Sequence, residues 1–149
     1  MLKYFNVNDK KIACWVNPVD FGAHAQSLVF IHGSGGTSDV WTMQYSKMHT
    51  RFNILAVNLP GHGKSEGAAE QSIDGCVARL REIIGAAGLS RPLLVGHSLG
   101  AAIALSFALH HPDEPSGVAA VGGGLAMPVN PDILSGFQTN PELVMDMMC

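Results

Sequence analysis

Short runs of apolar residues alternate along this chain with glycine-rich stretches, and this alternation predicts its secondary structure. Three apolar runs begin near Ser27, Asn53 and Pro92, and each is predicted to be a buried strand. Each run leads into a glycine-rich loop and then into a segment with the pattern of a helix. This order of strand, loop and helix is typical of a parallel sheet built through right-handed crossovers.

The remaining pattern predicts a hairpin, further helices and one more strand. Runs of β-prone residues at 3–7 and 11–16 flank the turn formers Asn8 and Asp9. Ser72 is placed to cap a helix whose apolar stripe ends at Gly85 or Gly88. The other predicted elements are a loop at residues 17–26, a short helix at 41–50, a helix from residue 99 to about 111 and a strand at 118–121.

Three glycine-rich loops, at residues 32–36, 60–63 and 96–100, follow the carboxyl ends of predicted strands. In open parallel sheets, ligands bind beyond those ends. The three glycine-rich loops are therefore predicted to lie together at the carboxyl ends of the parallel strands. We call this edge of the sheet the rim, and it is the candidate active site.

Composition narrows the class of protein. A chain of 149 residues is about one domain, long enough to bury roughly 68–70% of the surface that its unfolded form exposes. Its 47% hydrophobic and 14% charged residues favour a sheet covered by helices on both faces. The net charge of −3 provides no basic surface for nucleic acid or anionic lipid, so we expect a small-molecule partner.

The cysteines and the N-terminus bear on compartment and cofactors. Cys14, Cys76 and Cys149 are odd in number and widely spaced, so neither a disulfide framework nor a metal site is expected. The first residues lack an apolar signal core, and no run approaches the ~20 residues of a membrane span. We therefore expect a cytoplasmic protein that needs no cofactor.

The segment Gly96-His97-Ser98-Leu99-Gly100 joins a predicted strand to a predicted helix. A G-x-S-x-G turn in this context predicts a nucleophile elbow, in which flanking glycines let a strained backbone hold the serine hydroxyl outward. The start of the following helix also favours developing negative charge. Ser98 is therefore the predicted catalytic nucleophile.

A serine nucleophile needs hydrogen-bond donors for the oxyanion that forms on the substrate. The candidate donors are the backbone N–H of Leu99, directly after the nucleophile, and that of Ser34 or Gly35 in a neighbouring loop. Gly33, Gly35 and Gly36 would let that loop approach closely. The predicted oxyanion hole thus comprises Gly33, Ser34 and Leu99.

Three motifs in order resemble the first half of an α/β-hydrolase fold protein. They are Ile-His-Gly-Ser-Gly-Gly at 31–36, Leu-Pro-Gly-His-Gly-Lys-Ser at 59–65 and Gly-His-Ser-Leu-Gly at 96–100. Over residues 3–123 the chain is most similar to serine-nucleophile esterases and lysophospholipase-like members. Epoxide hydrolases and haloalkane dehalogenases share the fold but carry aspartate where Ser98 stands. One departure is Asn58, because family members usually have aspartate there.

The resemblance implies an α/β fold with a mostly parallel sheet and helices on both faces. About six strands are present, and the C-terminal part of the fold is expected to be missing. Residues 1–123 are expected to form the N-terminal part of the core domain, and 124–149 the start of a cap. The catalytic acid and histidine are expected beyond residue 149, so the 149-residue chain alone should be nearly inactive. The edge at 118–121 should then be exposed and self-associate.

The histidines within the chain do not offer an evident base. The resemblance makes His32 and His62 loop residues that brace the backbone. His97 is expected to pack into the rim, because adjacent side chains at a sharp turn point apart. The others are expected in loops or at a helix end, where a partly charged imidazole complements the dipole; they are His24, His49, His110 and His111.

The sequence therefore predicts a hydrolase of carboxylic esters or related small acyl substrates, acting through an acyl-enzyme on Ser98. Two other reactions on the same fold stay open, carbon–carbon bond hydrolysis and cofactor-free haloperoxidation. A non-catalytic protein that uses the hydrolase pocket to bind a ligand is the alternative of another class.

Overall fold

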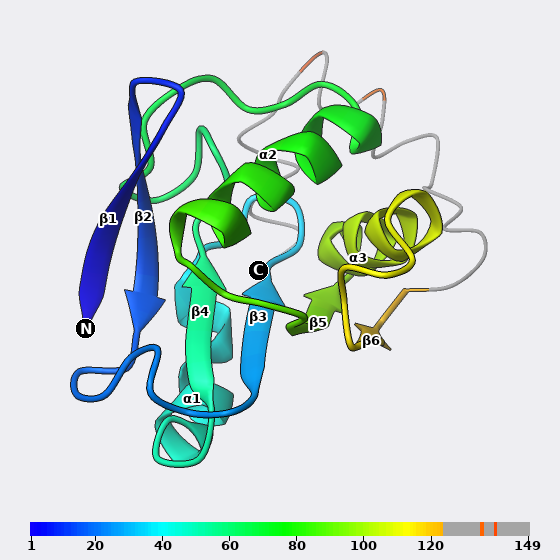
Figure 1. The fold of residues 1–149 in the computed structure, drawn as a ribbon. Helices are drawn as coiled ribbons and strands as arrows, with labels where there is room; N and C mark the ends of the chain where they lie inside the picture. Colours follow the sequence, from blue (N-terminus) through cyan, green and yellow to red (C-terminus); the bar gives the residue numbers. More distant parts are fainter. Residues whose placement is uncertain (124–134, 136–138, 140–149) are drawn as a thin grey trace.

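A computed structural model describes residues 1–123, Ser135 and Thr139. The predicted cap segment, 124–149, otherwise lies outside the described residues. The described strands form one sheet in the order β1-β2-β4-β3-β5-β6 (Figure 1). They are β1 (Leu2–Val7), β2 (Lys10–Val16), β3 (Ser27–Ile31), β4 (Asn53–Val57), β5 (Leu93–His97) and β6 (Gly117–Val121).

The sheet is mostly parallel, which confirms the predicted fold class. Strands β4, β3, β5 and β6 run parallel to one another, whereas β1 and β2 add an antiparallel edge. The turn between β1 and β2 places Asn8 and Asp9 at φ of 48° and 59°. Two consecutive positive φ values suit a two-residue hairpin turn, and asparagine and aspartate tolerate them better than most residues.

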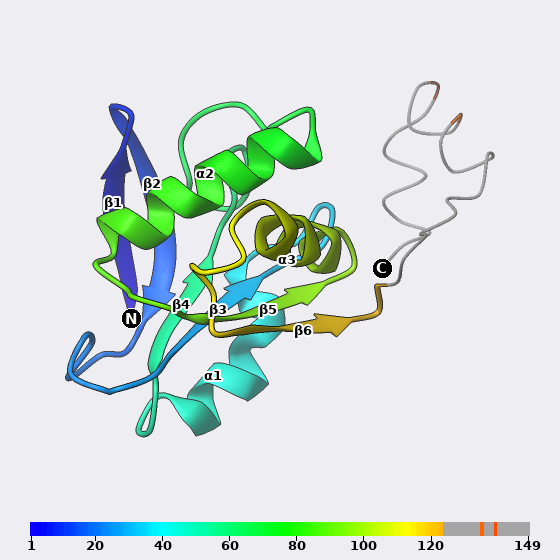
Figure 2. The same ribbon diagram turned by 45° about the vertical axis from the view of Figure 1, so that its right-hand side comes forward.

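Helices cover both faces of the sheet, as predicted (Figure 2). On one face α2 (Ile73–Ala86) and α3 (Leu99–His110) pack against alternate strand residues such as Val29, Ile31 and Leu55. On the other face, η1 (Ser38–Trp41) and α1 (Thr42–Met48) bury Trp41 and Tyr45 against the intervening residues. The parallel strands β3 and β4 are buried on both sides and hold the rim in place.

Helix α2 begins and ends on identifiable signals. The Ser72 hydroxyl accepts a hydrogen bond from the Gly75 N–H at 3.0 Å, as its predicted role as N-cap requires. At the other end Gly88 has φ of 68°, and its N–H and that of Leu89 bond to the carbonyls of Gly85 and Ile84. This is a Schellman motif. Gly88 therefore ends the helix, while Gly85 lies within it.

The segment predicted as a helix over 41–50 starts earlier and ends sooner. Thr37 has an extended backbone, and its hydroxyl accepts from the Asp39 N–H at 3.3 Å. That cap starts the 3-10 helix η1 ahead of α1, so the helical region runs from Ser38 to Met48. The sequence pattern missed this earlier start, because a single 3-10 turn is too short to show a periodic spacing of apolar residues.

Among the strands that the structure describes, β6 forms one edge of the sheet. It pairs with β5 on its inner side, and Val121 is exposed. The self-association expected from this edge stays a prediction. Within the described residues, none of the helices has the length and apolar content needed to cross a bilayer.

Candidate active site

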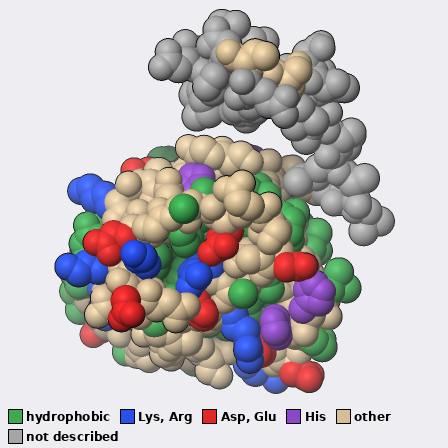
Figure 3. All heavy atoms as spheres, turned by 90° about the horizontal axis from the view of Figure 1, so that it is seen from above, with side chains coloured by type: hydrophobic (Ala, Val, Ile, Leu, Met, Phe, Trp, Pro, Cys, Tyr) green, Lys and Arg blue, Asp and Glu red, His purple; other side chains and the backbone are tan. Residues whose placement is uncertain are grey.

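The three glycine-rich loops meet at the carboxyl edge of the parallel strands. Ile31 at the end of β3 lies opposite Val57 of β4 and Gly96 of β5. The loops after these strands therefore leave the sheet side by side, toward the face seen in Figure 3. On that face acidic and basic side chains are interspersed.

Ser98 lies between β5 and α3 with a backbone that serine rarely adopts. Its φ is 53° and its ψ is −118°, a combination that costs on the order of 1–3 kcal/mol for a residue other than glycine. A hydrogen bond from the Ser98 N–H to the Val121 carbonyl, 3.0 Å long, helps to hold it there. The side chain is half-buried, as expected for a residue on the rim.

Only glycine fits at positions 96 and 100 on either side of Ser98, because a side chain at either position would clash with backbone atoms. A Cβ at Gly96 would lie 2.0 Å from the Gly100 carbonyl oxygen, so the chain could not turn back on itself with any side chain there. A Cβ at Gly100 would lie 2.3 Å from the Ile31 oxygen. The start of α3 therefore sits directly against the end of β3.

Gly33 brings the loop after β3 against Ser98. A Cβ at Gly33 would lie 3.1 Å from the Ser98 Cβ, so this loop touches the serine. The Gly36 N–H donates to the Gly33 carbonyl at 3.1 Å, and Gly35 has φ of 68°, which closes a tight turn that carries Ser34. Within residues 1–123, the backbone N–H groups of Ser34 and Leu99 have no hydrogen-bond acceptor.

His32 is fully buried and bonds through both ring nitrogens. Its Nε2 accepts a hydrogen bond from the Leu59 N–H at 3.1 Å, and Nδ1 lies 2.7 Å from the Gly33 carbonyl oxygen. Because Nε2 is an acceptor, we assign the proton to Nδ1, which donates to Gly33. Burial lowers the pKa of His32 from 6.5 to about 4, and the neighbouring His62 adds to this shift while the bond to Gly33 opposes it.

This buried histidine predicts acid sensitivity. Because the pKa of His32 lies below its unfolded value of 6.5, the unfolded chain binds more protons as the pH falls from 6.5 toward 4. The free energy of unfolding should fall over that window by up to about 3 kcal/mol from this group alone. Urea titrations at several pH values should show a steeper loss for the wild type than for His32→Gln.

Exposed His110 offers the control, because His110→Gln removes an imidazole without touching a buried hydrogen bond. Equal pH slopes for the wild type and His32→Gln would contradict the assignment of a buried neutral imidazole at position 32.

The other histidines among residues 1–123 form hydrogen bonds with groups other than Ser98 or lie at the surface. His62 places Nδ1 3.0 Å from the Pro60 oxygen, and His49 and His110 bond within their own helical segments. His97 is exposed and lines a cavity of about 270 Å³ with Val40, Trp41, Gln44 and Val121. Among residues 1–123 no hydrogen bond joins the Ser98 hydroxyl to an imidazole or a carboxylate.

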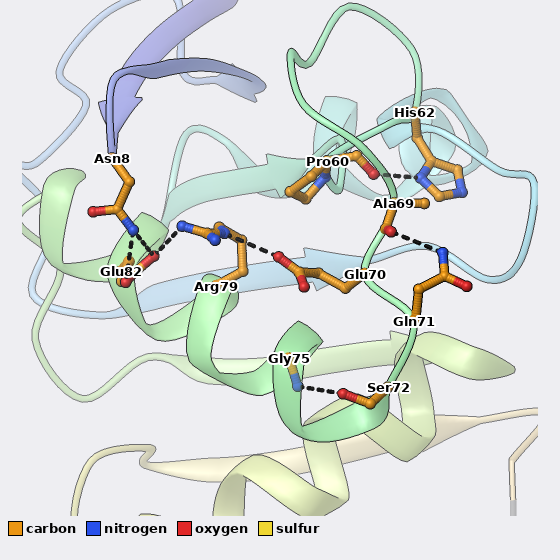
Figure 4. A network of polar contacts seen from close by, with 10 residues as sticks. All are labelled: Asn8, Pro60, His62, Ala69, Glu70, Gln71, Ser72, Gly75, Arg79 and Glu82. Carbon is orange, nitrogen blue, oxygen red and sulfur yellow. Dashed lines mark hydrogen bonds and ion pairs between the residues drawn. The ribbon is translucent and has the colours of Figure 1, made fainter.

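The loop after β4 is fastened to α2 by a polar network (Figure 4). Glu70 bonds Arg79 at 3.3 Å, Arg79 also bonds Glu82, and Glu82 accepts from the Asn8 side chain in the hairpin turn. These pairs are partly exposed and each contributes at most about 1 kcal/mol. Together they fix the loop that carries His62 at the rim.

Comparisons with known proteins agree with this architecture. Residues 26–144 match the family model described as alpha/beta hydrolase fold. A pimeloyl-[acyl-carrier protein] methyl ester esterase of Edwardsiella ictaluri is 32% identical over 125 residues, covering 79% of this chain and 47% of the relative. A 2-hydroxy-6-oxononadienedioate/2-hydroxy-6-oxononatrienedioate hydrolase of Paraburkholderia phymatum is 32% identical over 132 residues, covering 85% and 46%.

Solved structures give the same result. A bacterial membrane phospholipase A described as a virulence factor superposes with a TM-score of 0.79 at 25% identity, covering 95% of this chain and 46% of that one. The chain spans about a third to a half of the length of the curated relatives that it matches.

Proposed function

The chain belongs to the α/β-hydrolase fold family, and from this premise we propose that it carries the nucleophile and the oxyanion hole of a serine hydrolase. The proposed substrates are carboxylic esters or related small acyl compounds. The observation that carries the proposal is the strained backbone of Ser98, held between β5 and α3 with the Gly33 loop against it. Relatives named as esterases and hydrolases support the same class of reaction.

In the proposed reaction, the Ser98 oxygen bonds to the carbonyl carbon of the ester while a base takes the hydroxyl proton. The carbonyl oxygen becomes an oxyanion that accepts hydrogen bonds from the amides of Leu99 and Ser34. The intermediate expels the alcohol, which takes the proton from the base and leaves an acyl group on Ser98. Water, deprotonated by the same base, then attacks this ester and releases the carboxylic acid and the free serine.

The backbone supports this role for the amides. Within residues 1–123 the Leu99 N–H at the start of α3 has no hydrogen-bond acceptor, so it stays open to a ligand. The start of a helix carries partial positive charge, which favours an oxyanion. His32 would keep the Ser34 turn in place without charge of its own. We further propose that the base and its orienting acid come from beyond residue 149, as the resemblance to the family implies.

A fluorophosphonate probe tests the acyl-enzyme directly. In the folded, full-length protein the probe should label one serine, and Ser98→Ala should lose the label while Ser106→Ala on α3 keeps it. The 149-residue chain alone should label weakly, because it lacks the proposed base. An absence of labelling at every pH between about 6 and 9 would instead favour the ligand-binding alternative.

A carbon–carbon bond hydrolase is the second candidate, favoured by the match to the 2-hydroxy-6-oxononadienedioate hydrolase. Both candidates use Ser98 and the same oxyanion donors. Turnover of 2-hydroxy-6-oxononadienedioate measured beside that of a simple alkyl ester distinguishes them, because a carbon–carbon hydrolase should prefer the former.

A further inference from the structure

The loop that carries Ser34 is fastened at both ends by two consecutive residues that follow β4. At its entry, the Leu59 N–H donates to His32 Nε2 at 3.1 Å. At its exit, the Ser38 N–H donates to Asn58 Oδ1 at 2.6 Å. Because Asn58 and Leu59 are adjacent, both ends of the loop at residues 33–37 are tied to the same place, directly after β4.

Asn58 is itself held firmly, so it can serve as an anchor. Its N–H donates to the Ala13 carbonyl at 3.0 Å, and its carbonyl accepts from the Ser65 hydroxyl at 2.6 Å. Gly63, with φ of 56°, packs on the amide so closely that a Cβ there would lie 3.0 Å from the Asn58 Cγ. The side chain is 4% exposed, so water does not compete for the bond to Ser38.

We propose that Asn58 is a positioning residue of the active site, which sets the place of the Ser34 amide relative to Ser98 through its bond to Ser38. The inference rests on the proposed function, because it concerns the same oxyanion hole. Asn58 acts through the loop and need not touch the substrate. A shift of about 1 Å in a catalytic group can cost roughly 100-fold in rate. Loosening the loop should therefore lower kcat strongly and weaken substrate binding only slightly.

The chemistry required of position 58 is that of a hydrogen-bond acceptor. A carboxylate offers acceptor oxygens at the same distance from the backbone as the asparagine amide oxygen, and charge-assisted bonds to N–H groups are strong. Asn58→Asp should therefore keep the bond to Ser38, whereas Asn58→Ala removes it. This difference separates the proposed role from a general effect of substitution.

Asn53 gives a matched control in the same strand. It opens β4, is 3% exposed, and its Oδ1 accepts the N–H groups of Gly22 and His24 at 2.8 and 3.0 Å. Asn53→Ala thus removes a buried amide of the same kind at the end of the strand away from the rim.

The experiment measures kcat, KM and the thermal midpoint of the full-length protein with an activated ester. We expect Asn58→Ala to lower kcat by about 10- to 100-fold with KM changed less than about threefold. Asn58→Asp should stay within about fivefold of wild-type kcat, and Asn53→Ala should lower the midpoint and leave kcat unchanged.

Equal losses of kcat in Asn58→Ala and Asn53→Ala, or an Asn58→Asp as impaired as Asn58→Ala, would overturn the proposal. If Asn58→Ala does not fold, Asn58→Ser provides the same comparison, because it keeps a polar group at the site but is too short to reach Ser38. Ser98→Ala assayed in parallel separates the two hypotheses: activity that survives it refutes the proposed function, whatever Asn58 does.

Discussion

Replacing Ser98 by alanine in the full-length protein is expected to lower kcat for ester hydrolysis by on the order of 10⁶-fold, as large a loss as follows removal of the nucleophile from a serine protease. The reason is that the proposed reaction forms its covalent bond on the Ser98 hydroxyl, which lies at the start of α3 with the Gly33 loop against it. KM should change little, since alanine removes one oxygen and leaves the donors in place. Steady-state kinetics with an activated ester measure both quantities.

Ser106→Ala is the matched control for this loss. Ser106 is also half-buried on α3, and its hydroxyl lies 3.3 Å from His110 Nδ1, away from the rim. It should keep wild-type kcat. A loss below about 100-fold in Ser98→Ala would assign bond cleavage to another group, because a water molecule bound by the oxyanion hole alone is a far weaker catalyst.

The sharp turn at Ser98 between β5 and α3 was predictable from sequence because its determinants are local. Gly96 and Gly100 flank the serine at fixed spacing, and apolar residues on either side identify a strand and a helix. The turn at Asn8 and Asp9 was predictable for the same reason, since a two-residue hairpin selects residues that tolerate positive φ. In each case the residue types carry the backbone geometry.

The two hydrogen bonds that hold the loop between His32 and Ser38 were not predictable, because their partners lie in the segments that follow two different strands. His32 and Leu59 meet only when β3 and β4 pair, and so do Asn58 and Ser38. In the sequence Asn58 stood out only as a departure from the family's usual aspartate. Its role as an acceptor is seen only in the folded chain, where its amide oxygen accepts the hydrogen bond from the Ser38 N–H. A carboxylate oxygen could accept the same bond.

The substitution Gly100→Ala is expected to destabilise the fold by at least about 3 kcal/mol, which should lower the thermal midpoint on the order of 10 °C. Within a helix alanine is normally favoured over glycine by about 1 kcal/mol. Here the new Cβ would lie 2.3 Å from the Ile31 oxygen and 2.7 Å from the His32 oxygen, both of them backbone atoms that cannot rotate away. The clash therefore outweighs the helical preference.

Gly85→Ala is the same substitution in α2, where a Cβ would meet no atom within 4 Å. It should stabilise the protein by about 0.5–1 kcal/mol, so the two variants should shift the midpoint in opposite directions in one calorimetric comparison. A Gly100→Ala protein as stable as the wild type would show that α3 does not sit against the end of β3. The Leu99 amide could then not face the Gly33 loop across Ser98, and the proposed oxyanion hole would lose the contact that assembles it.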